Sequence, residues 1–383
     1  MKYEPPIDHP RLLLFLQQSY GIPARHLLFV PMGMVSCSYI VEGDGQRWFL
    51  KLLGPSRLAQ IARERLGFYL PVCERLFELG HAVPNAIRTR SGQWVGDFED
   101  QHTVLAPYLE GQVVVDLPHP TGLYPRLGAA VAHLHRDTPL LGLDPAACPY
   151  VERWQPHWRP TLLAGMARAA SLDPTACRPG QARLRDLLLR EQEQIRSMLA
   201  RMDDLGRAVQ ASQPLMVLVN TDLNYSNLIL GDTGRLWLLD WEGAMLGPAE
   251  NDLFIFTGDD FEDFLVSYGR EFGLGHLSAE SFGYNFYRRN LEDVTDWVVT
   301  ILHENTRDEQ DAEDLEGIQS DCMGGWPWLE DGIERVRKML KKYKAGRYAR
   351  LLHHTSIVES AFLPGNWTGE NVRVFSERAR GFS

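Results

Sequence analysis

Three side chains suited to metal and acid–base chemistry stand at the two ends of one short apolar hairpin. Asp222 precedes the first apolar run, Leu228–Leu230, and Asn227 adjoins it. Asp240 follows the returning run, Leu236–Leu239. Because a hairpin brings the chain back to its starting edge, we expect Asp240 beside Asn227. Carboxylate and amide oxygens suit Mg²⁺, which takes one or two protein ligands together with water and phosphate oxygens.

Asp222 adds a general base to this arrangement. An aspartate beside such a metal site can accept the proton of an attacking hydroxyl, as phosphoryl transfer requires. A structural arrangement fits the same spacing, with Asx turns at Asp222 and Asn227 and a helix cap at Asp240. Spacing alone leaves both interpretations open.

Composition and charge narrow the class of protein. The chain has 383 residues, enough for two lobes, and its 44% hydrophobic and 23% charged residues are typical of globular proteins. A net charge of −11 argues against nucleic-acid binding and would attract small cations. The N-terminus has no secretory pattern, and no apolar run approaches the roughly 20 residues of a membrane span. Five cysteines without a C-x-x-C pair indicate reduced thiols, and we therefore predict a cytoplasmic protein.

The pattern of elements changes near residue 110. The first part should contain a helix over 11–20, strands over 27–33 and 36–53, a helix over 56–80 that Pro71 should kink or divide, and further strands up to 111. Helical periods then dominate 124–137, 181–202, 262–273, 284–304 and 329–354. We predict a strand-rich lobe over 1–110 with a linker near 105–111, and a helix-rich lobe over 111–383. The last forty or so residues are interpreted as an extension.

The central motifs resemble those of the aminoglycoside phosphotransferase family. They read D-L-x-x-x-N, an apolar hairpin ending in L-D-W-E, and G-P-x-x-x-D-L, and are formed by Asp222-Leu223, Asn227, Leu239–Glu242, Gly247-Pro248 and Asp252-Leu253. The resemblance implies an α+β, bilobal, protein-kinase-like fold with a nucleotide-binding N-terminal lobe. It implies an ATP-dependent O-phosphotransferase in which Asp222 orients or deprotonates the acceptor hydroxyl. Asn227 and Asp240 would hold Mg²⁺–ATP.

One position departs from the family pattern. The residue two places before the aspartate is usually a histidine with a scaffold role, and here it is Asn220. Asparagine can donate and accept similar hydrogen bonds, so we expect the scaffold to be kept. The resemblance gives Asp252 a structural role.

The first lobe should supply the nucleotide contacts. Lys51, in an apolar strand, is expected on the ATP phosphates by resemblance, although an edge-strand lysine facing water remains an alternative. Glu64 on the following helix is the expected ion-pair partner, with Glu74 as a weaker choice. Ser36 lies in a loop without the G-x-G-x-x-G pattern and is assigned to phosphate binding.

The linker should read the purine base. The stretch Leu105–Gln112 matches the segment between lobes, and we assign Ala106 and Tyr108 to cofactor binding. ATP is the expected nucleotide, and GTP stays open.

The acceptor is interpreted from charge and from a closer likeness to spectinomycin or aminocyclitol phosphotransferases. Glu242, Glu292 and Asp293 would give the site an acidic floor for a cationic acceptor, although ordinary solvated positions also suit the last two. Antibiotic resistance is the implied role, in a monomer or weak dimer. A housekeeping kinase for an amino alcohol, a sugar or homoserine is the alternative enzyme, and a nucleotide-binding pseudokinase module is the non-catalytic one.

Overall fold

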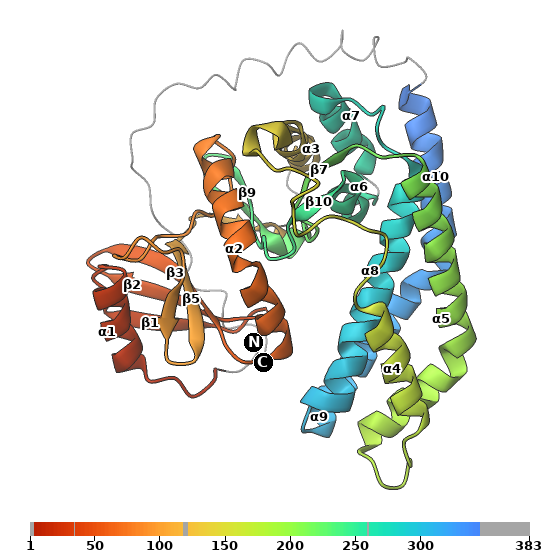
Figure 1. Ribbon diagram of the computed structural model, residues 1–383, viewed down its shortest axis with the longest axis horizontal. Helices are drawn as coiled ribbons and strands as arrows, with labels where there is room; N and C mark the ends of the chain where they lie inside the picture. Colours follow the sequence, from red (N-terminus) through yellow and green to blue (C-terminus); the bar gives the residue numbers. More distant parts are fainter. Residues whose placement is uncertain (1–3, 34, 118–121, 259, 345–383) are drawn as a thin grey trace. The chain divides into compact units, whose positions relative to one another are not determined.

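The computed structural model describes residues 4–33, 35–117, 122–258 and 260–344, which pack as two compact units (Figure 1). The first unit contains the described residues up to 143 together with 220–244. The second contains 144–219 and the described residues from 245 onward. The polar-tipped hairpin therefore packs with the strand-rich part of the chain. A lobe boundary near residue 110 stays a prediction, and the C-terminal extension lies outside the described residues.

A five-stranded antiparallel sheet forms the strand-rich part of the first unit. Its order is β1-β2-β3-β5-β4, with β1 (His26–Val30), β2 (Cys37–Gly43), β3 (Gln46–Leu53), β5 (Gln101–Pro107) and β4 (Gly96–Phe98). A turn at Asp44-Gly45 joins β2 to β3, and both of its residues have positive φ, as a two-residue hairpin requires. The expected small sheet is confirmed.

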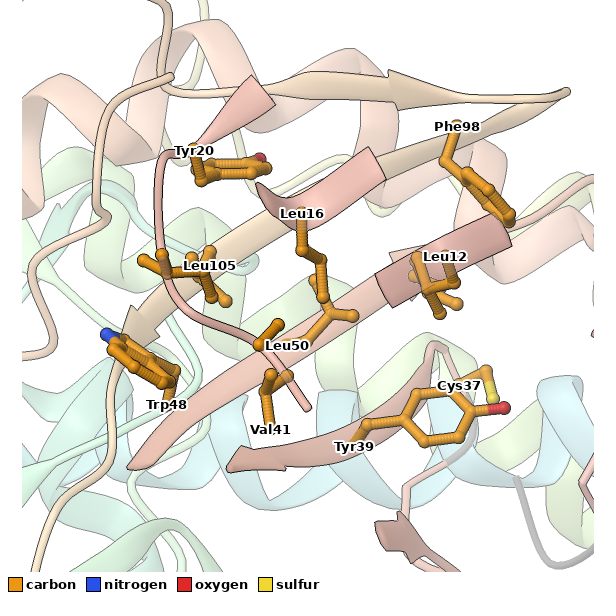
Figure 2. Packing of buried hydrophobic residues seen from close by; sticks show 13 residues of the cluster. Leu12, Leu16, Tyr20, Cys37, Tyr39, Val41, Trp48, Leu50, Phe98 and Leu105 are labelled. Atoms are coloured by element: carbon orange, nitrogen blue, oxygen red, sulfur yellow. The ribbon is translucent and has the colours of Figure 1, made fainter. Parts of the chain in front are cut away.

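One face of this sheet is closed by helix α1 (His9–Ser19), as Figure 2 shows. Leu12 and Leu16, one helical turn apart, pack in a buried cluster with alternate residues of β2 and β3, including Tyr39 and Leu50. Because side chains alternate along a strand, Lys51 must point to the opposite face of the sheet. The hydrophobic core thus sets the direction of the lysine.

Helix α2 (Arg57–Glu78) follows β3 and begins at Ser56, whose hydroxyl accepts a hydrogen bond from the Ala59 N–H. Of the two expected effects of Pro71, division of the helix is wrong, because the helix runs unbroken through the proline (Figure 1), and a kink stays a prediction. Val72 and Cys73 beside the proline are buried, so packing of the apolar face compensates for the lost backbone bond.

The predicted polar-tipped hairpin is present in the first unit. Strands β8 (Leu228–Leu230) and β9 (Leu236–Leu238) pair antiparallel, and β6 (Gln112–Val113) adds to the edge of β8. The Gly234 N–H donates to the carbonyl of Gly231 and closes the turn. Helix α3 (Leu123–Arg136) contacts β9.

The second unit is mainly helical. It contains α4 (Arg159–Ala170), α5 (Pro179–Ala211), α6 (Glu250–Leu253), α7 (Phe261–Phe272), α8 (Ala279–Val299), α9 (Asp308–Gly317) and α10 (Leu329–Lys342). Strands β7 (Met216–Val219) and β10 (Met245–Pro248) pair antiparallel within it. Helix α8 contacts α4, α5 and α10.

Short irregular helices complete the described chain: η1 (Val114–Asp116), η2 (Thr138–Leu141), η3 (Tyr225–Asn227), η4 (Phe254–Phe256), η5 (Thr300–Glu304), η6 (Ile318–Cys322) and η7 (Met323–Trp328). Within the described ranges, none of the helices is both long enough and apolar enough to cross a membrane.

Candidate active site

Asp222 is held by two asparagine side chains in the loop before β8. Its Oδ1 accepts a hydrogen bond from Asn224 Nδ2 at 3.1 Å, and its Oδ2 accepts one from Asn227 Nδ2 at 2.9 Å. Asn227 Nδ2 also donates to the Asp222 carbonyl at 2.8 Å. These bonds fix the carboxylate and direct the Asn227 amino group toward it, so Oδ1 is the atom with which Asn227 can bind a cation.

Asn220 links this loop to the end of the hairpin. The side chain is fully buried. Its Nδ2 donates to the carbonyls of Leu239 and Asp240, both at 3.0 Å, and its Oδ1 accepts from the Asp222 N–H at 3.0 Å. The asparagine therefore joins the loop holding Asp222 to the end of the hairpin, as the scaffold role expected of it requires.

Two residues of this site have backbone in the left-handed region of φ/ψ space. Thr221 has φ of 76° and Asp240 has φ of 56°, although neither is glycine. Such a conformation is uncommon for a β-branched residue and costs about 1–3 kcal/mol, so the surrounding bonds must impose it. Strain of this kind is often found at functional sites.

The hairpin brings Asp240 to Asn227, as the sequence predicts. The Leu239 N–H donates to the Asn227 carbonyl at 2.8 Å, which extends the ladder by one bond beyond β9. Lys51 Nζ lies 2.7 Å from Asp240 Oδ1 and 2.7 Å from Glu242 Oε1. A lysine from β3, the end of the hairpin and the loop holding Asp222 therefore form one connected site.

The charges in this site are strongly coupled. Burial alone would lower the pKa of Lys51, but Asp240 and Glu242 outweigh it and hold that pKa well above its ordinary value. Although burial opposes ionisation of Asp240, Lys51 keeps the pKa of Asp240 low. Burial and the charge of Asp240 raise the pKa of Glu242. Asp240 therefore carries the negative charge of the pair, and Glu242 shares the lysine with it.

The choice of Glu64 as the partner of Lys51 is corrected by the structure. Glu64 is exposed on α2, whereas Asp240 and Glu242 contact the lysine. Arg65, the next residue, faces the site and donates from Nε to the Glu242 carbonyl at 2.5 Å and from Nη2 to the Ala244 carbonyl at 2.6 Å.

The phase of helix α2 explains this correction. Tyr69 and Cys73, four and eight positions beyond Arg65, are buried on the same face of the helix. Burial and then the charge of Glu242 raise the pKa of both side chains. Glu74, the weaker candidate, instead binds Arg88 at 2.6 Å. Arg65 was not among the predicted site residues, although its spacing of four positions from the buried Tyr69 places it on the same face of the helix.

The two linker residues assigned to the nucleotide, Ala106 and Tyr108, direct backbone groups toward β3. The Tyr108 N–H donates to the Arg47 carbonyl at 3.2 Å, and Ala106 pairs with Phe49 in the same alternating ladder. Ala106 and Tyr108 therefore turn their backbone groups toward β3. Pro107, between them, turns its carbonyl the other way.

Ser36 is buried in the connection between β1 and β2, and its Oγ lies 3.2 Å from Ser38 Oγ. Its role toward phosphate stays a prediction.

Each carboxylate of the predicted acidic floor has a cationic side chain beside it. On α8, Glu292 pairs with Arg288 at 3.4 Å and Asp293 pairs with Arg289 at 3.0 Å, each across one helical turn. Burial raises the pKa of Asp293 to about 6. Glu242 is also engaged, since it contacts Lys51. Binding of an acceptor by these three carboxylates stays a prediction, and each has a protein partner in the structure.

The ligand set at the hairpin fits a magnesium–nucleotide complex. No group of three His, Cys, Asp or Glu side chains within the described ranges could hold a metal ion by itself. Asp240 and Asn227 offer two hard oxygen ligands, which is the number Mg²⁺ takes when phosphates and water complete its octahedron. Lys51 beside them supplies a positive charge for phosphate.

Comparisons with known proteins agree with this geometry. The family model described as "Phosphotransferase enzyme family" matches residues 30–289. A homoserine kinase of Parvibaculum lavamentivorans (strain DS-1) is 28% identical over 103 residues, which is 27% of this chain and only 30% of the length of that kinase.

Solved structures share the fold. A spectinomycin phosphotransferase in complex with ADP and spectinomycin has a TM-score of 0.65 at 16% identity, covering 82% of this chain and 95% of that one. A microcompartment-associated aminopropanol kinase has a TM-score of 0.56 at 15% identity, covering 85% and 98%. The choline kinase LicA from Streptococcus pneumoniae has a TM-score of 0.50 at 14% identity, covering 82% and 100%.

Proposed function

The chain belongs to the phosphotransferase enzyme family and is a small-molecule kinase, and from this premise we propose that it moves the γ-phosphoryl group of ATP to a hydroxyl of an amine-bearing acceptor. The observation that supports this most is the connected set of Lys51, Asp240, Asn227 and Asp222 within one compact unit. Each has the chemistry that one part of phosphoryl transfer needs.

The proposed mechanism gives each side chain one role. Asp222 accepts the proton of the acceptor hydroxyl, and the amides of Asn224 and Asn227 keep its carboxylate oriented. Lys51 binds the ATP phosphates. Asp240 and Asn227 hold Mg²⁺, which when bound neutralises charge on the phosphate oxygens. Retention of all four groups supports an enzyme over a nucleotide-binding module.

The linker supports ATP over GTP. The Leu105 carbonyl accepts a hydrogen bond from the Ile87 N–H at 2.7 Å. At this end of β5 the backbone N–H and C=O groups of the odd-numbered residues therefore point away from β3. Pro107 therefore offers a carbonyl and no N–H on that edge. Adenine carries a 6-amino donor that matches a carbonyl, whereas guanine carries the O6 acceptor, which would face it with like polarity.

An amine-bearing acceptor is supported by shared chemistry. Spectinomycin, aminopropanol, choline and homoserine, named for the proteins this chain is similar to, each combine a hydroxyl with a basic or quaternary nitrogen. The net charge of −11 would attract such cations. A spectinomycin-like aminocyclitol is the acceptor we favour, and a housekeeping amino-alcohol kinase is the second candidate.

The test is a panel of acceptors read by product mass. The purified protein is incubated with Mg²⁺ and ATP, or GTP in parallel, and with spectinomycin, other aminoglycosides, choline, aminopropanol, homoserine and neutral sugars. Addition of one phosphoryl group to an amine-bearing alcohol, with ATP preferred, is the expected result. A neutral sugar that outcompetes every amine would refute the acceptor class. Nucleotide binding without any transfer would favour the binding module.

A further inference from the structure

We infer that Glu242, from the segment after β9, positions Lys51 for the nucleotide phosphates, and that Arg65 holds this segment in place. The inference rests on the proposed function, because it concerns the lysine that would bind ATP. It gives Glu242 the task of pairing with Lys51, which the sequence analysis assigns to Glu64 on α2.

The contacts of Lys51 favour Glu242 as its permanent partner. Both carboxylates lie 2.7 Å from Nζ, but the Glu242 side chain is 15% exposed and that of Asp240 is 39% exposed. The second oxygen of Glu242, Oε2, is buried and accepts no hydrogen bond from any described residue. Glu242 therefore has a deeper position and a spare acceptor on the same carboxylate, with which it can follow small movements of the ammonium group.

Competition for Asp240 strengthens the assignment. A carboxylate that binds a divalent cation gives most of its charge to that cation, and the cation repels a neighbouring ammonium. Asp240 is the proposed metal ligand, so its bond to Lys51 weakens when metal and nucleotide bind. The Glu242 carboxyl group, still 2.7 Å from Nζ and no longer opposed by a free charge on Asp240, then keeps the lysine directed at the phosphates.

The backbone that carries Glu242 is fixed by side chains at three consecutive carbonyls. Arg65 donates to the carbonyls of Glu242 and Ala244 at 2.5 and 2.6 Å. Thr221 Oγ1 donates to the Gly243 carbonyl at 3.2 Å. A planar guanidinium with two donors fixes orientation as well as distance. Helix α2 is thus coupled to the site through Arg65 and the backbone instead of through a lysine–glutamate pair.

The close packing around Gly243 agrees with a fixed segment. A Cβ added at this glycine would come within 2.2 Å of Thr221 Oγ1 and 3.0 Å of the Asn220 carbonyl. Only a residue without a side chain fits here, so the loop holding Asp222 and the segment holding Glu242 are packed against each other.

The experiment is a double-mutant cycle read by the dissociation constant for Mg²⁺–ATP, which needs no acceptor. Glu242→Gln is expected to weaken binding by about tenfold or more, as removing one partner of a buried charge pair does. In a Lys51→Met background the same change should have less than about a twofold effect, because its target is gone. Glu242→Asp, which keeps the charge, should recover part of the affinity.

Two variants on α2 test the rival explanation. Glu64→Gln removes the carboxylate that the sequence favours and should leave the affinity unchanged within about twofold. Glu78→Gln, exposed on the same helix, is its matched control. Losses at Glu242 and Lys51 that simply add, or a loss at Glu64 larger than at Glu242, would overturn the inference while the proposed function stands. A wild-type protein that binds no nucleotide would instead refute the proposed function and the inference together.

Discussion

Replacing Asn220 with alanine tests whether one buried amide keeps the loop that holds Asp222 and the hairpin together. Asn220 makes at least three hydrogen bonds at 3.0 Å, to Asp222, Leu239 and Asp240. At about 1 kcal/mol of net stabilisation per bond, Asn220→Ala should lower the free energy of unfolding by about 3 kcal/mol. Because its partners include the proposed base and a metal ligand, we also expect kcat to fall by about tenfold or more.

Asn224→Ala is the matched control for this prediction. Asn224 also binds Asp222, but its side chain is only half-buried and its two donor distances are 3.1 and 3.4 Å. Its Oδ1 also accepts a hydrogen bond from the Ser226 N–H at 2.9 Å, and water can replace the hydrogen bonds of a half-buried side chain. Its removal should cost about 1 kcal/mol. Denaturant unfolding of both variants, together with the acceptor assay, measures the difference. If Asn220→Ala is no more destabilising than Asn224→Ala and keeps its kcat, the scaffold role is refuted.

Three further predictions concern single side chains. Asp222→Asn should keep the fold and the affinity for Mg²⁺–ATP but lower kcat by about 10²–10⁴-fold, and near wild-type turnover would show that another group takes the proton. Asp240→Ala should weaken ATP binding in Mg²⁺ and leave metal-free binding nearly unchanged; equal losses in both conditions would indicate a structural role. Burial raises the pKa of Glu250 from 4.5 to about 7, so the folded protein holds a proton that the unfolded chain releases, and stability falls as pH rises through this window. Glu250→Gln should therefore raise the free energy of unfolding at pH 8 by about 1–3 kcal/mol and leave it unchanged at pH 4; an equal change at both pH values would contradict burial as the cause.

Local patterns predicted the small sheet and the polar-tipped hairpin, and the family resemblance predicted the kinase-like fold. The polar-tipped hairpin was predicted because two apolar runs flank a glycine turn, and the position of Lys51 opposite the α1 core follows from strand alternation. The expected kinase-like fold is confirmed by the family match and the solved structures. The roles of Asp222, Asn227 and Asp240 stay predictions, although the structure brings all three together.

The sequence did not reveal which face of helix α2 meets the hairpin, or which backbone groups of β5 point away from β3. Glu64 and Arg65 differ by one position and about 100° around α2, and choosing between them requires knowing which face of the helix meets the hairpin. Ala106 and Pro107 differ in the same way along β5, where one step reverses the direction of the backbone groups. Helix α4, which has only a weak apolar stripe, was not predicted at all.

The division of the first unit along the chain has a consequence for how the protein is made. The pairing of Gln112 with Leu230 joins β6 to β8 across a long intervening segment, most of which (144–219) belongs to the other unit. Closing so long a loop is entropically unfavourable and slows folding. During synthesis, Lys51 is made well before Asp240 and Glu242, so its contacts with both carboxylates can form only after the ribosome has produced them. Neither unit can be excised as one continuous fragment, and a chain stopped at residue 143 would carry Lys51 without either of the carboxylates that it contacts.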